Sequence, residues 1–280
     1  MDLRAYMAER SPLVEAFLEG CLPPADQPPE ALHGAMRHLV FPGGKRLRPL
    51  LAMASAEAVG GSAEQALPAA AAVELIHTYS LIHDDLPCMD DDAERRGRPS
   101  VHVAFGEAVA VLAGDALQAL AFEVMARAAD THGPALAAAA ALDLARAVGS
   151  AGLVGGQVDD LAFDPATLSN ERIESVHERK SAALIAAAVV GGARLAGGSD
   201  PQLADLARFG FEVGIAFQIA DDLLDEGEGD PCSSLTVLGR EGAEKRAEWL
   251  LANALDRVES LGSPAEVLRE LARFSVRRDT

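Results

Sequence analysis

Two long stretches of this chain would be apolar around their whole circumference if they were helical, and this feature restricts the folds open to it. The stretches cover residues 104–128 and 181–196. A helix that is apolar on every side has to be surrounded by other elements. Alternation of Val, Ile and Thr, which strands need, is almost absent, whereas Ala and Leu are abundant. The sequence therefore predicts an all-α bundle with these two stretches as central helices.

Short polar segments, rather than a long linker, separate the expected helices. Ser199-Asp200-Pro201 indicates a helix start, because a capping side chain followed by proline at the first helical position satisfies the free backbone donors. No Gly/Ser-rich or charged linker divides the 280 residues, so residues 1–280 are expected to form a single domain. The periodicity predicts helices at 2–20, 28–40, 44–60, 63–91, 104–130, 134–160, 169–197, 200–225 and 241–275.

Charge and composition argue against several classes of partner. The net charge of −19 disfavours binding to nucleic acid or to an anionic membrane surface. Residues 1–17 lack the apolar core of a signal peptide, and no stretch of about 18 apolar residues is free of charges or helix breakers. We therefore expect a cytoplasmic protein with no nucleic-acid partner and no integral membrane association. Cys21, Cys88 and Cys232 are odd in number and far apart, which gives little support to a disulfide or a zinc site.

The densest group of charges lies in residues 83–92 (HDDLPCMDDD), directly after an apolar helical run. Two carboxylates about 4 Å apart repel each other by roughly 4 kcal/mol at an effective dielectric constant of 20, so such a cluster calls for a cation. Oxygen ligands favour Mg²⁺, with Mn²⁺ as a second possibility. Pro87 removes a backbone donor and should distort the turn, which would let Asp84 and Asp90 converge. The competing interpretation is a solvated acidic helix end.

A second acidic group follows another apolar helix at residues 218–225 (QIADDLLD). Asp221 and Asp225 are one helical turn apart and therefore lie on the same face. Two acidic helix ends that face each other could hold a diphosphate between them through bridging Mg²⁺ ions, each of which usually takes one or two carboxylates as well as phosphate oxygens and water.

Cations occur close to both acidic groups. Residues 43–49 (GGKRLRP) place three cations after a Gly-Gly turn at a helix start, where side chains and free N–H groups could bind a diphosphate. Arg95 and Arg96 follow the first acidic group, and His77 lies two turns before Asp84. The alternatives are a solvated basic helix start, a surface salt bridge and a packed histidine.

Together these motifs resemble the trans-isoprenyl diphosphate synthase family, the polyprenyl synthetases, and in particular its short-chain farnesyl and geranylgeranyl branch. The resemblance implies the isoprenoid-synthase fold, a helical bundle with a central substrate cavity. It also implies Mg²⁺ as the cofactor, isopentenyl diphosphate and an allylic prenyl diphosphate as substrates, and a homodimer. The matching motifs are GGKRLRP (43–49), DDLPCMDDDAERRG (84–97), GGQVDDL (155–161), ERKSAAL (178–184) and FQIADDLLD (217–225).

The resemblance also implies a role for individual residues. Those expected to hold isopentenyl diphosphate are Lys45, Arg48, His77 and Arg96. Those expected to contact the allylic diphosphate are Arg95 and Lys180. The implied metal ligands are Asp84, Asp90 and Asp221. Those that complete the allylic site are Ser181, Gln218, Asp222 and Asp225. The catalytic set is expected to comprise Asp84, Asp85, Lys180, Gln218, Asp221 and Asp222.

The implied reaction is ionisation of the allylic diphosphate, attack by the isopentenyl double bond and loss of a proton. Product length in the family depends on bulk beneath the first acidic motif, and Tyr79 lies five residues before Asp84. An aromatic residue there, with the Pro87-Cys88 insertion, resembles bacterial farnesyl synthases. We therefore expect farnesyl diphosphate made from dimethylallyl or geranyl diphosphate, with geranylgeranyl diphosphate as the alternative product.

The stretch 226–240 departs from the family pattern. Relatives carry a longer loop there with two lysines that closes over the site, whereas this stretch is short and contains no lysine. This difference keeps open a non-catalytic homologue that acts as a partner subunit. A terpene cyclase is less favoured, because its second motif usually has an Asn/Ser/Glu pattern. A helical phosphohydrolase would show more His-Asp pairs than the one at His83-Asp84.

Overall fold

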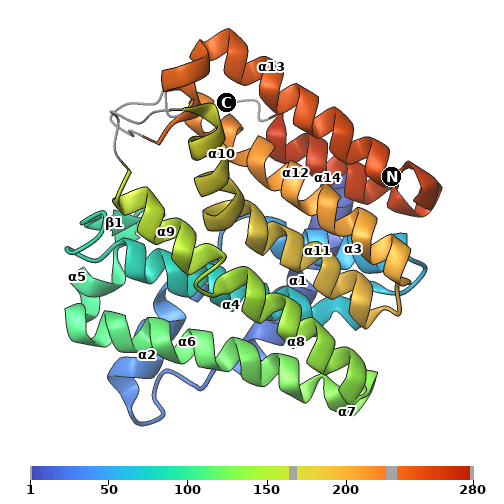
Figure 1. The fold of residues 1–280 in the computed structure, drawn as a ribbon. Coiled ribbons are helices and arrows are strands. Elements are labelled where there is room, and N and C mark those ends of the chain that lie inside the picture. The colour runs from blue at the N-terminus through green and yellow to red at the C-terminus, as the bar shows by residue number, and fades with distance from the viewer. Residues whose placement is uncertain (1, 164–168, 225–231, 278–280) are drawn as a thin grey trace.

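The computed structural model describes residues 2–163, 169–224 and 232–277, which form a bundle of packed helices (Figure 1). The longer helices run roughly side by side, and short connections join them. Helices α1 to α7 are α1 (Leu3–Cys21), α2 (Glu30–Val40), α3 (Leu47–Ala58), α4 (Leu67–Asp84), α5 (Val101–Phe105), α6 (Glu107–Arg127) and α7 (Ala129–His132). Helices α8 to α14 are α8 (Pro134–Val148), α9 (Leu153–Leu161), α10 (Asn170–His177), α11 (Ala183–Leu195), α12 (Asp200–Leu224), α13 (Ser234–Arg257) and α14 (Glu266–Val276). Shorter helical segments are η1 (Ala63–Ala66), η3 (Glu178–Ala182), η4 (Glu259–Leu261) and η5 (Ser263–Ala265).

Helix α11 lies at the centre of the bundle, as the sequence predicts for residues 181–196. Its side chains are buried almost without interruption from Ala183 to Leu195. Leu184 belongs to one apolar cluster, which α4 and α6 share, while Ile185 belongs to a second cluster with α12, α13 and α14. A helix that packs on both sides needs apolar residues all round, which explains its composition.

Helix α6 corrects the other half of that prediction, because residues 104–128 do not form a central helix. Gly106, with φ 87°, separates α5 from α6. One face of α6 packs on α4 and buries Leu117 completely, but Val111 and Leu112 on the other face are 41% and 56% exposed. In Figure 1 the helix lies along the edge of the bundle. Composition alone does not show whether an apolar face is covered by the same chain.

By length and composition alone, the stretches Glu107–His132 and Pro134–Leu161 could cross a membrane. The first stretch comprises α6 and α7, and the second comprises α8 and α9 with a break around Gly149–Gly152. Edge helices of a bundle meet the same criterion, so it is weak evidence for a membrane span.

The first acidic motif lies mostly outside a helix, whereas the sequence predicted a helix over 63–91. Helix α4 ends at Asp84, and the following turn folds back so that the Asp90 N–H donates to the Asp84 carbonyl at 2.9 Å. After the turn, strand β1 (Glu94–Arg95) pairs antiparallel with β2 (Arg98–Pro99). Arg96 and Gly97 both have positive φ, which a tight two-residue hairpin requires. Across this hairpin Arg95 donates to Asp85, whereas Arg96 donates to the Leu39 carbonyl.

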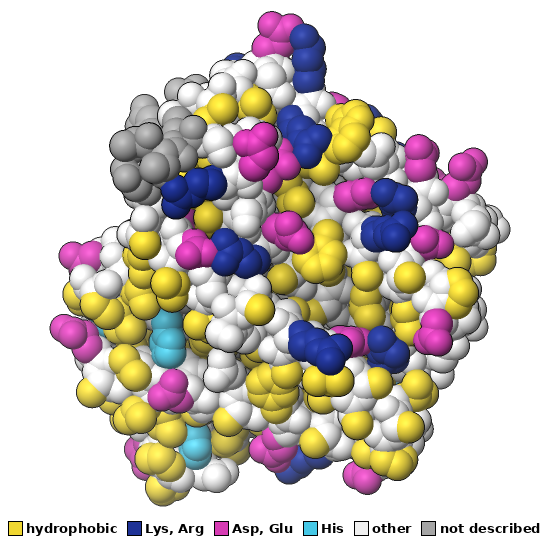
Figure 2. All heavy atoms as spheres, viewed as in Figure 1, with side chains coloured by type: hydrophobic (Ala, Val, Ile, Leu, Met, Phe, Trp, Pro, Cys, Tyr) yellow, Lys and Arg dark blue, Asp and Glu magenta, His cyan; other side chains and the backbone are white. Residues whose placement is uncertain are grey.

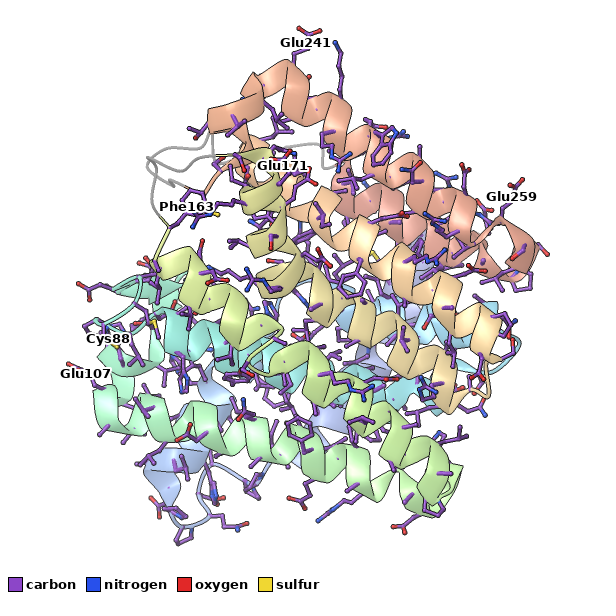
Figure 3. The ribbon with its side chains drawn as sticks, in the orientation of Figure 1. Cys88, Glu107, Phe163, Glu171, Glu241 and Glu259 are labelled. Carbon is purple, nitrogen blue, oxygen red and sulfur yellow. The ribbon has the colours of Figure 1, made fainter. Side chains whose placement is uncertain are left out.

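Within the described part of the chain, none of the three cysteines forms a disulfide. Cys88 is exposed in the turn after α4, at the outer edge of the molecule in Figure 3. Cys232 is buried next to α10, where its carbonyl oxygen contacts His177.

Candidate active site

A cavity of about 480 Å³ lies between α4, α9, η3 and α12. Polar and charged side chains line most of it, and Leu153, Leu184 and Phe217 supply apolar wall. The structure therefore gathers one site from segments as far apart in the sequence as Arg48 and Asp221. The predicted site residues that line this cavity are Arg48, His77, Asp84, Arg95, Arg96, Lys180, Ser181, Gln218 and Asp221.

Carboxylates reach this cavity from two helix ends. Asp84 is the last residue of α4, and Asp221 lies in the last turn of α12. Burial raises the pKa of Asp84 to about 6, and repulsion from Asp90 adds to this although Lys180 opposes it. Burial likewise raises the pKa of Asp90. The neighbouring cations do not fully stabilise the ionised form of these carboxylates, and a divalent cation would provide the missing positive charge.

The donor set fits a Mg²⁺ ion that the substrate helps to hold. Among the described residues, no three acidic, His or Cys side chains stand close enough to form a metal centre by themselves. Mg²⁺ commonly takes only one or two carboxylates and fills its other positions with phosphate oxygens and water. Asp84 on one side and Asp221 on the other meet that requirement. Asp90, the third predicted ligand, lies in the turn after α4 and does not belong to the lining of the cavity. Asp225, also expected at this site, lies outside the described residues.

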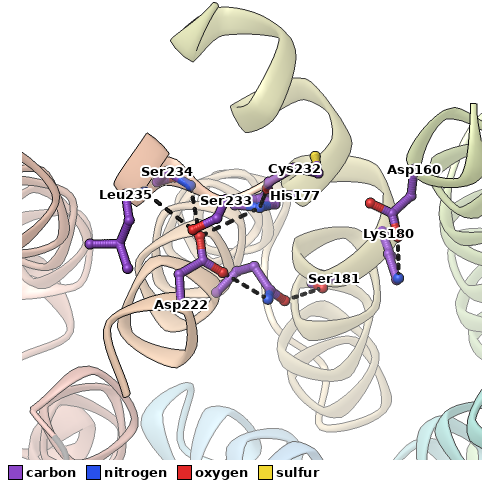
Figure 4. Close-up of polar contacts among 10 residues, drawn as sticks. Asp160, His177, Lys180, Ser181, Asp222, Cys232, Ser233, Ser234 and Leu235 are labelled. Atoms are coloured by element: carbon purple, nitrogen blue, oxygen red, sulfur yellow. Dashed lines mark hydrogen bonds and ion pairs between the residues drawn. The ribbon is translucent and has the colours of Figure 1, made fainter. Parts of the chain in front are cut away.

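Asp85 and Asp222 differ from their neighbours, since neither belongs to the lining of the cavity. Asp85 is fully buried and accepts a hydrogen bond from Arg95 Nε at 2.8 Å, so it holds a cation that does line the cavity. Asp222 is also buried and accepts from the Ser234 N–H at 2.9 Å and from the Gln218 amide at 3.5 Å (Figure 4). In the structure these two carboxylates bind other groups of the protein and do not line the cavity, and their predicted catalytic role stays a prediction.

Lys180 and Ser181 enter the cavity from η3, a wide helical turn between α10 and α11. Such π-type turns break the regular register of a helix and redirect its side chains. Lys180 Nζ contacts Asp160 Oδ2 at 2.5 Å, and Ser181 Oγ donates to Gln218 Oε1 at 2.8 Å (Figure 4). Burial alone would lower the pKa of Lys180, but Asp160 with Asp84 and Asp90 raises it. The ammonium group therefore stays charged beside the acidic motif.

Two glycines allow neighbouring helices to reach η3. A Cβ atom on Gly156 would lie 2.3 Å from the Lys180 backbone nitrogen, and one on Gly214 would lie 2.4 Å from Ala182 Cα. Contacts this short exclude any side chain at either position. Helices α9 and α12 thus pack directly against the turn that carries Lys180.

A smaller pocket of about 190 Å³ adjoins the cavity and shares Arg48, His77, Arg96 and Phe217 with it. Lys45 lines this pocket, with its ammonium group 5.8 Å from the centre of the Phe274 ring. Burial, together with the surrounding arginines, holds the pKa of His77 well below its usual value. His77 is therefore neutral at physiological pH, and the arginines and lysine carry the positive charge.

Tyr79 lies outside both pocket linings, one turn before His83 on α4. Its ring is buried and packs edge-to-face on the His83 ring at 5.7 Å, in the apolar cluster that α4 shares with α6. Tyr79 is therefore buried inside the bundle, and its role as a floor for the growing chain stays a prediction.

Several residues of the site were not predicted individually, among them Asp160, Gln157, Glu74 and Phe274. The first two belong to the motif GGQVDDL, whose acidic end could have indicated a partner for Lys180. Both polar atoms of the Gln157 carboxamide are buried without a hydrogen-bond partner in the part of the chain that the structure describes, although the residue lines the cavity. Unpaired buried polar atoms at a cavity indicate a ligand that pairs with them. No sequence pattern indicated Phe274, because it lies far along the sequence from every motif.

An all-α bundle in which two acidic helix ends and several cations converge on one internal cavity defines the isoprenoid-synthase fold. The polyprenyl synthetase family matches residues 29–271 of the sequence, and the chain belongs to this family.

Individual relatives agree. The chain is 46% identical over 229 residues to the large subunit 1 of the chloroplastic heterodimeric geranylgeranyl pyrophosphate synthase of Arabidopsis thaliana, covering 80% of this chain and 61% of that protein. It is 43% identical over 276 residues to the chloroplastic geranylgeranyl pyrophosphate synthase 12 of the same plant, covering 97% and 75%. The chain thus spans about three-fifths of the length of the first relative. The crystal structure of an FPP/GFPP synthase from Zymomonas mobilis superposes with a TM-score of 0.90 at 39% identity, covering 98% of both chains.

These relatives overturn one expectation. The sequence predicted a cytoplasmic protein, but the curated plant relatives are chloroplastic. The prediction rested on the lack of an apolar leader, and plastid transit peptides are amphipathic rather than apolar, so that criterion could not have detected one.

Proposed function

We propose that this protein is a prenyl transferase that condenses isopentenyl diphosphate with allylic diphosphates and makes geranylgeranyl diphosphate. The observation that carries the proposal is the shared cavity, in which Asp84 and Asp221 come from two helix ends and Lys180 lies between two acidic groups. The plant relatives are geranylgeranyl synthases, and they favour this product over the farnesyl diphosphate that the sequence suggested. We take residues 1–280 to act as one domain in this reaction.

The charged side chains divide the work of binding two diphosphates. Lys180 and Arg95, with Asp84 and Asp221, hold the allylic diphosphate in the larger cavity, while Lys45, Arg48 and Arg96 hold isopentenyl diphosphate in the adjoining pocket. Asp84, Asp90 and Asp221 would hold Mg²⁺, which would supply Lewis-acid stabilisation of the departing diphosphate. Fixed cations stabilise the same charge without reorganising. Leu153, Leu184 and Phe217 keep water away from the reactive carbon.

Farnesyl diphosphate is a second candidate product, favoured by Tyr79. A buried aromatic ring between α4 and α6 would limit the depth to which a growing chain can enter the bundle. The C20 product requires the side chains around Tyr79 to move and admit one more five-carbon unit, whereas the C15 product does not.

Product analysis tests the proposal. Purified protein is incubated with Mg²⁺, labelled isopentenyl diphosphate and, separately, dimethylallyl, geranyl and farnesyl diphosphates. A C20 product supports the proposal, while a C15 end product keeps the prenyl transferase and assigns Tyr79 as the floor. Absence of product, with intact binding of a non-hydrolysable allylic analogue, would instead favour a non-catalytic partner subunit. Asp221→Asn is the inactive control, and Cys88→Ser, in the exposed turn, is the matched active control.

We also propose that a second copy of this chain covers the apolar face at the edge of the bundle. Figure 2 shows hydrophobic side chains gathered over α5, α6 and α9. Val103, Val111, Leu112 and Val158 are each at least 41% exposed there. Burying a large apolar side chain contributes about 1.5–3 kcal/mol, so a few such residues can stabilise a dimer. Light scattering of the wild type and of Leu112→Glu tests this, with a dimer and a monomer as the expected results.

A further inference from the structure

Arg46 has a different environment from the two cations beside it. All three cations border the pocket, but Lys45 is exposed and Arg48 is half-buried, whereas the Arg46 side chain is only 2% exposed. Its backbone has φ 52° and ψ 33°, a left-handed conformation that non-glycine residues rarely adopt. This conformation sits at the residue immediately before α3, so the turn that begins the helix also directs the side chain inward.

The Arg46 guanidinium joins three other helices. It contacts Glu15 of α1 through Nε at 2.7 Å and Nη2 at 3.0 Å. Its Nη1 donates to Glu74 of α4 at 2.5 Å, and Nη2 donates to the Val40 carbonyl at the end of α2 at 2.7 Å. Each of the three guanidinium nitrogens thus donates at least one hydrogen bond. A lysine ammonium cannot reproduce this geometry.

Gly43 makes room for this arrangement. A Cβ atom there would lie 1.9 Å from the Arg46 guanidinium carbon, so any side chain at residue 43 would displace the group. Gly44 has a different neighbour, because its Cβ would lie 3.2 Å from Arg96. The Gly43-Gly44 turn therefore packs against two guanidinium groups, that of Arg46 and that of Arg96.

Glu74 adds an electrostatic requirement. This carboxylate is 3% exposed, lies one turn before His77 and lines the pocket proposed for isopentenyl diphosphate. An unpaired carboxylate there would repel a diphosphate. Arg46 is its partner, and the attraction between them is strong because both groups are buried.

We propose that Arg46 is a positioning residue for the isopentenyl diphosphate pocket: it fixes the turn that aims Lys45 and Arg48, and it neutralises Glu74. In this role Arg46 acts through Lys45, Arg48 and Glu74, because its own donors are taken by Glu15, Glu74 and the Val40 carbonyl. This inference rests on the proposed function only in assigning the pocket to a diphosphate.

The experiment is a mutant cycle read by direct binding. Isopentenyl diphosphate and, separately, inorganic pyrophosphate are titrated calorimetrically into the wild type, Arg46→Met, Glu74→Gln and the double variant. Arg46→Met should weaken binding of isopentenyl diphosphate by about tenfold or more, because a buried carboxylate loses its partner. Glu74→Gln in that background should restore much of the affinity. The KM for isopentenyl diphosphate should rise, and the KM for the allylic substrate should stay within about threefold of the wild type.

Matched controls separate positioning from loss of stability. Arg10→Met breaks the ion pair with Glu57, which links α1 to the far end of α3. Glu57 lies about 16 Å along α3 from Arg46. Gly43→Ala should reproduce the effect of Arg46→Met, whereas Gly20→Ala, whose Cβ meets nothing within 4 Å, should not. If Arg46→Met does not fold, Arg46→Lys takes its place and should show a smaller loss in the same direction.

Two outcomes would overturn the inference: unchanged binding in the Arg46 variants, or an equal loss of affinity in Arg10→Met. Failure of Glu74→Gln to restore binding would remove the electrostatic role. A third result is that the wild type binds isopentenyl diphosphate, and the variants lose and regain affinity as expected, while no product is made. That result would refute the proposed function and leave the inference on Arg46 intact.

Discussion

Replacing Asp84 by asparagine should stabilise the protein while removing its proposed metal-dependent activity. Burial raises the pKa of this carboxyl from its ordinary 3.8 to about 6, so the folded state disfavours the ionised form at neutral pH. A difference of about two in pKa, at about 1.4 kcal/mol for each, corresponds to roughly 3 kcal/mol. Solvent reaches part of the group, which reduces the expected gain to roughly 1.5–3 kcal/mol. The melting temperature should then rise by about 3–10 °C.

The pH dependence follows from the sign of the change. Between pH 3.8 and about 6 the folded chain binds the Asp84 proton more strongly than the unfolded chain does. The stabilising effect of this proton is complete below the unfolded pKa and is lost as the pH rises through about 6. The advantage of Asp84→Asn over the wild type should therefore be largest at pH 8 and fall to about half at pH 5.

Denaturant unfolding in the presence of EDTA, at pH 5 and pH 8, measures this directly. Asp91→Asn is the matched control, because Asp91 belongs to the same turn but is exposed. With Mg²⁺ and a diphosphate analogue the order should reverse, since only the wild type gains from metal binding. A variant that is less stable than the wild type in EDTA, or whose advantage does not depend on pH, would refute the reasoning.

Three further predictions concern the surroundings of the cavity. Lys180→Met should lower turnover by at least about 100-fold and Lys180→Arg by less, because a fixed charge is lost in one and displaced in the other; steady-state kinetics with equal turnover in both would contradict this. Gly156→Ala should destabilise the fold by about 1–3 kcal/mol, since the new Cβ would lie 2.3 Å from the Lys180 backbone nitrogen; an unchanged denaturation midpoint would contradict it. Asp222→Ala should destabilise the protein by about 1–2 kcal/mol by leaving the Ser234 N–H unpaired, with increased hydrogen exchange at the start of α13 and little change at α8.

Much of the fold follows from local sequence patterns. Helix α12 begins at Asp200, after the left-handed Gly197, as the capping pattern predicts. The continuous apolar character of residues 181–196 correctly predicts the central helix α11. Both acidic motifs lie at helix ends, because an apolar helix has to emerge from the core before it can carry several carboxylates. These features depend on neighbouring residues only, so a single sequence is sufficient to predict them.

The candidate site could be predicted as a set of residue types, but not as an arrangement of side chains. Successive residues of a helix point about 100° apart, so the orientation of the whole helix decides which of two adjacent carboxylates reaches the cavity. Asp84 and Asp221 line it, whereas Asp85 holds Arg95 and Asp222 holds the start of α13.

The sequence by itself determined the helical class, the acidic helix ends and the presence of cations near them, because periodicity, capping and charge density are local properties. Only the tertiary structure decided that Arg46 turns inward while Lys45 faces the pocket, and that α6 lies at the edge with an apolar face exposed. These outcomes depend on which distant helices supply a partner or a covering surface. Glu74 and Glu15 draw Arg46 inward from 28 and 31 residues away, a pairing that no local pattern records.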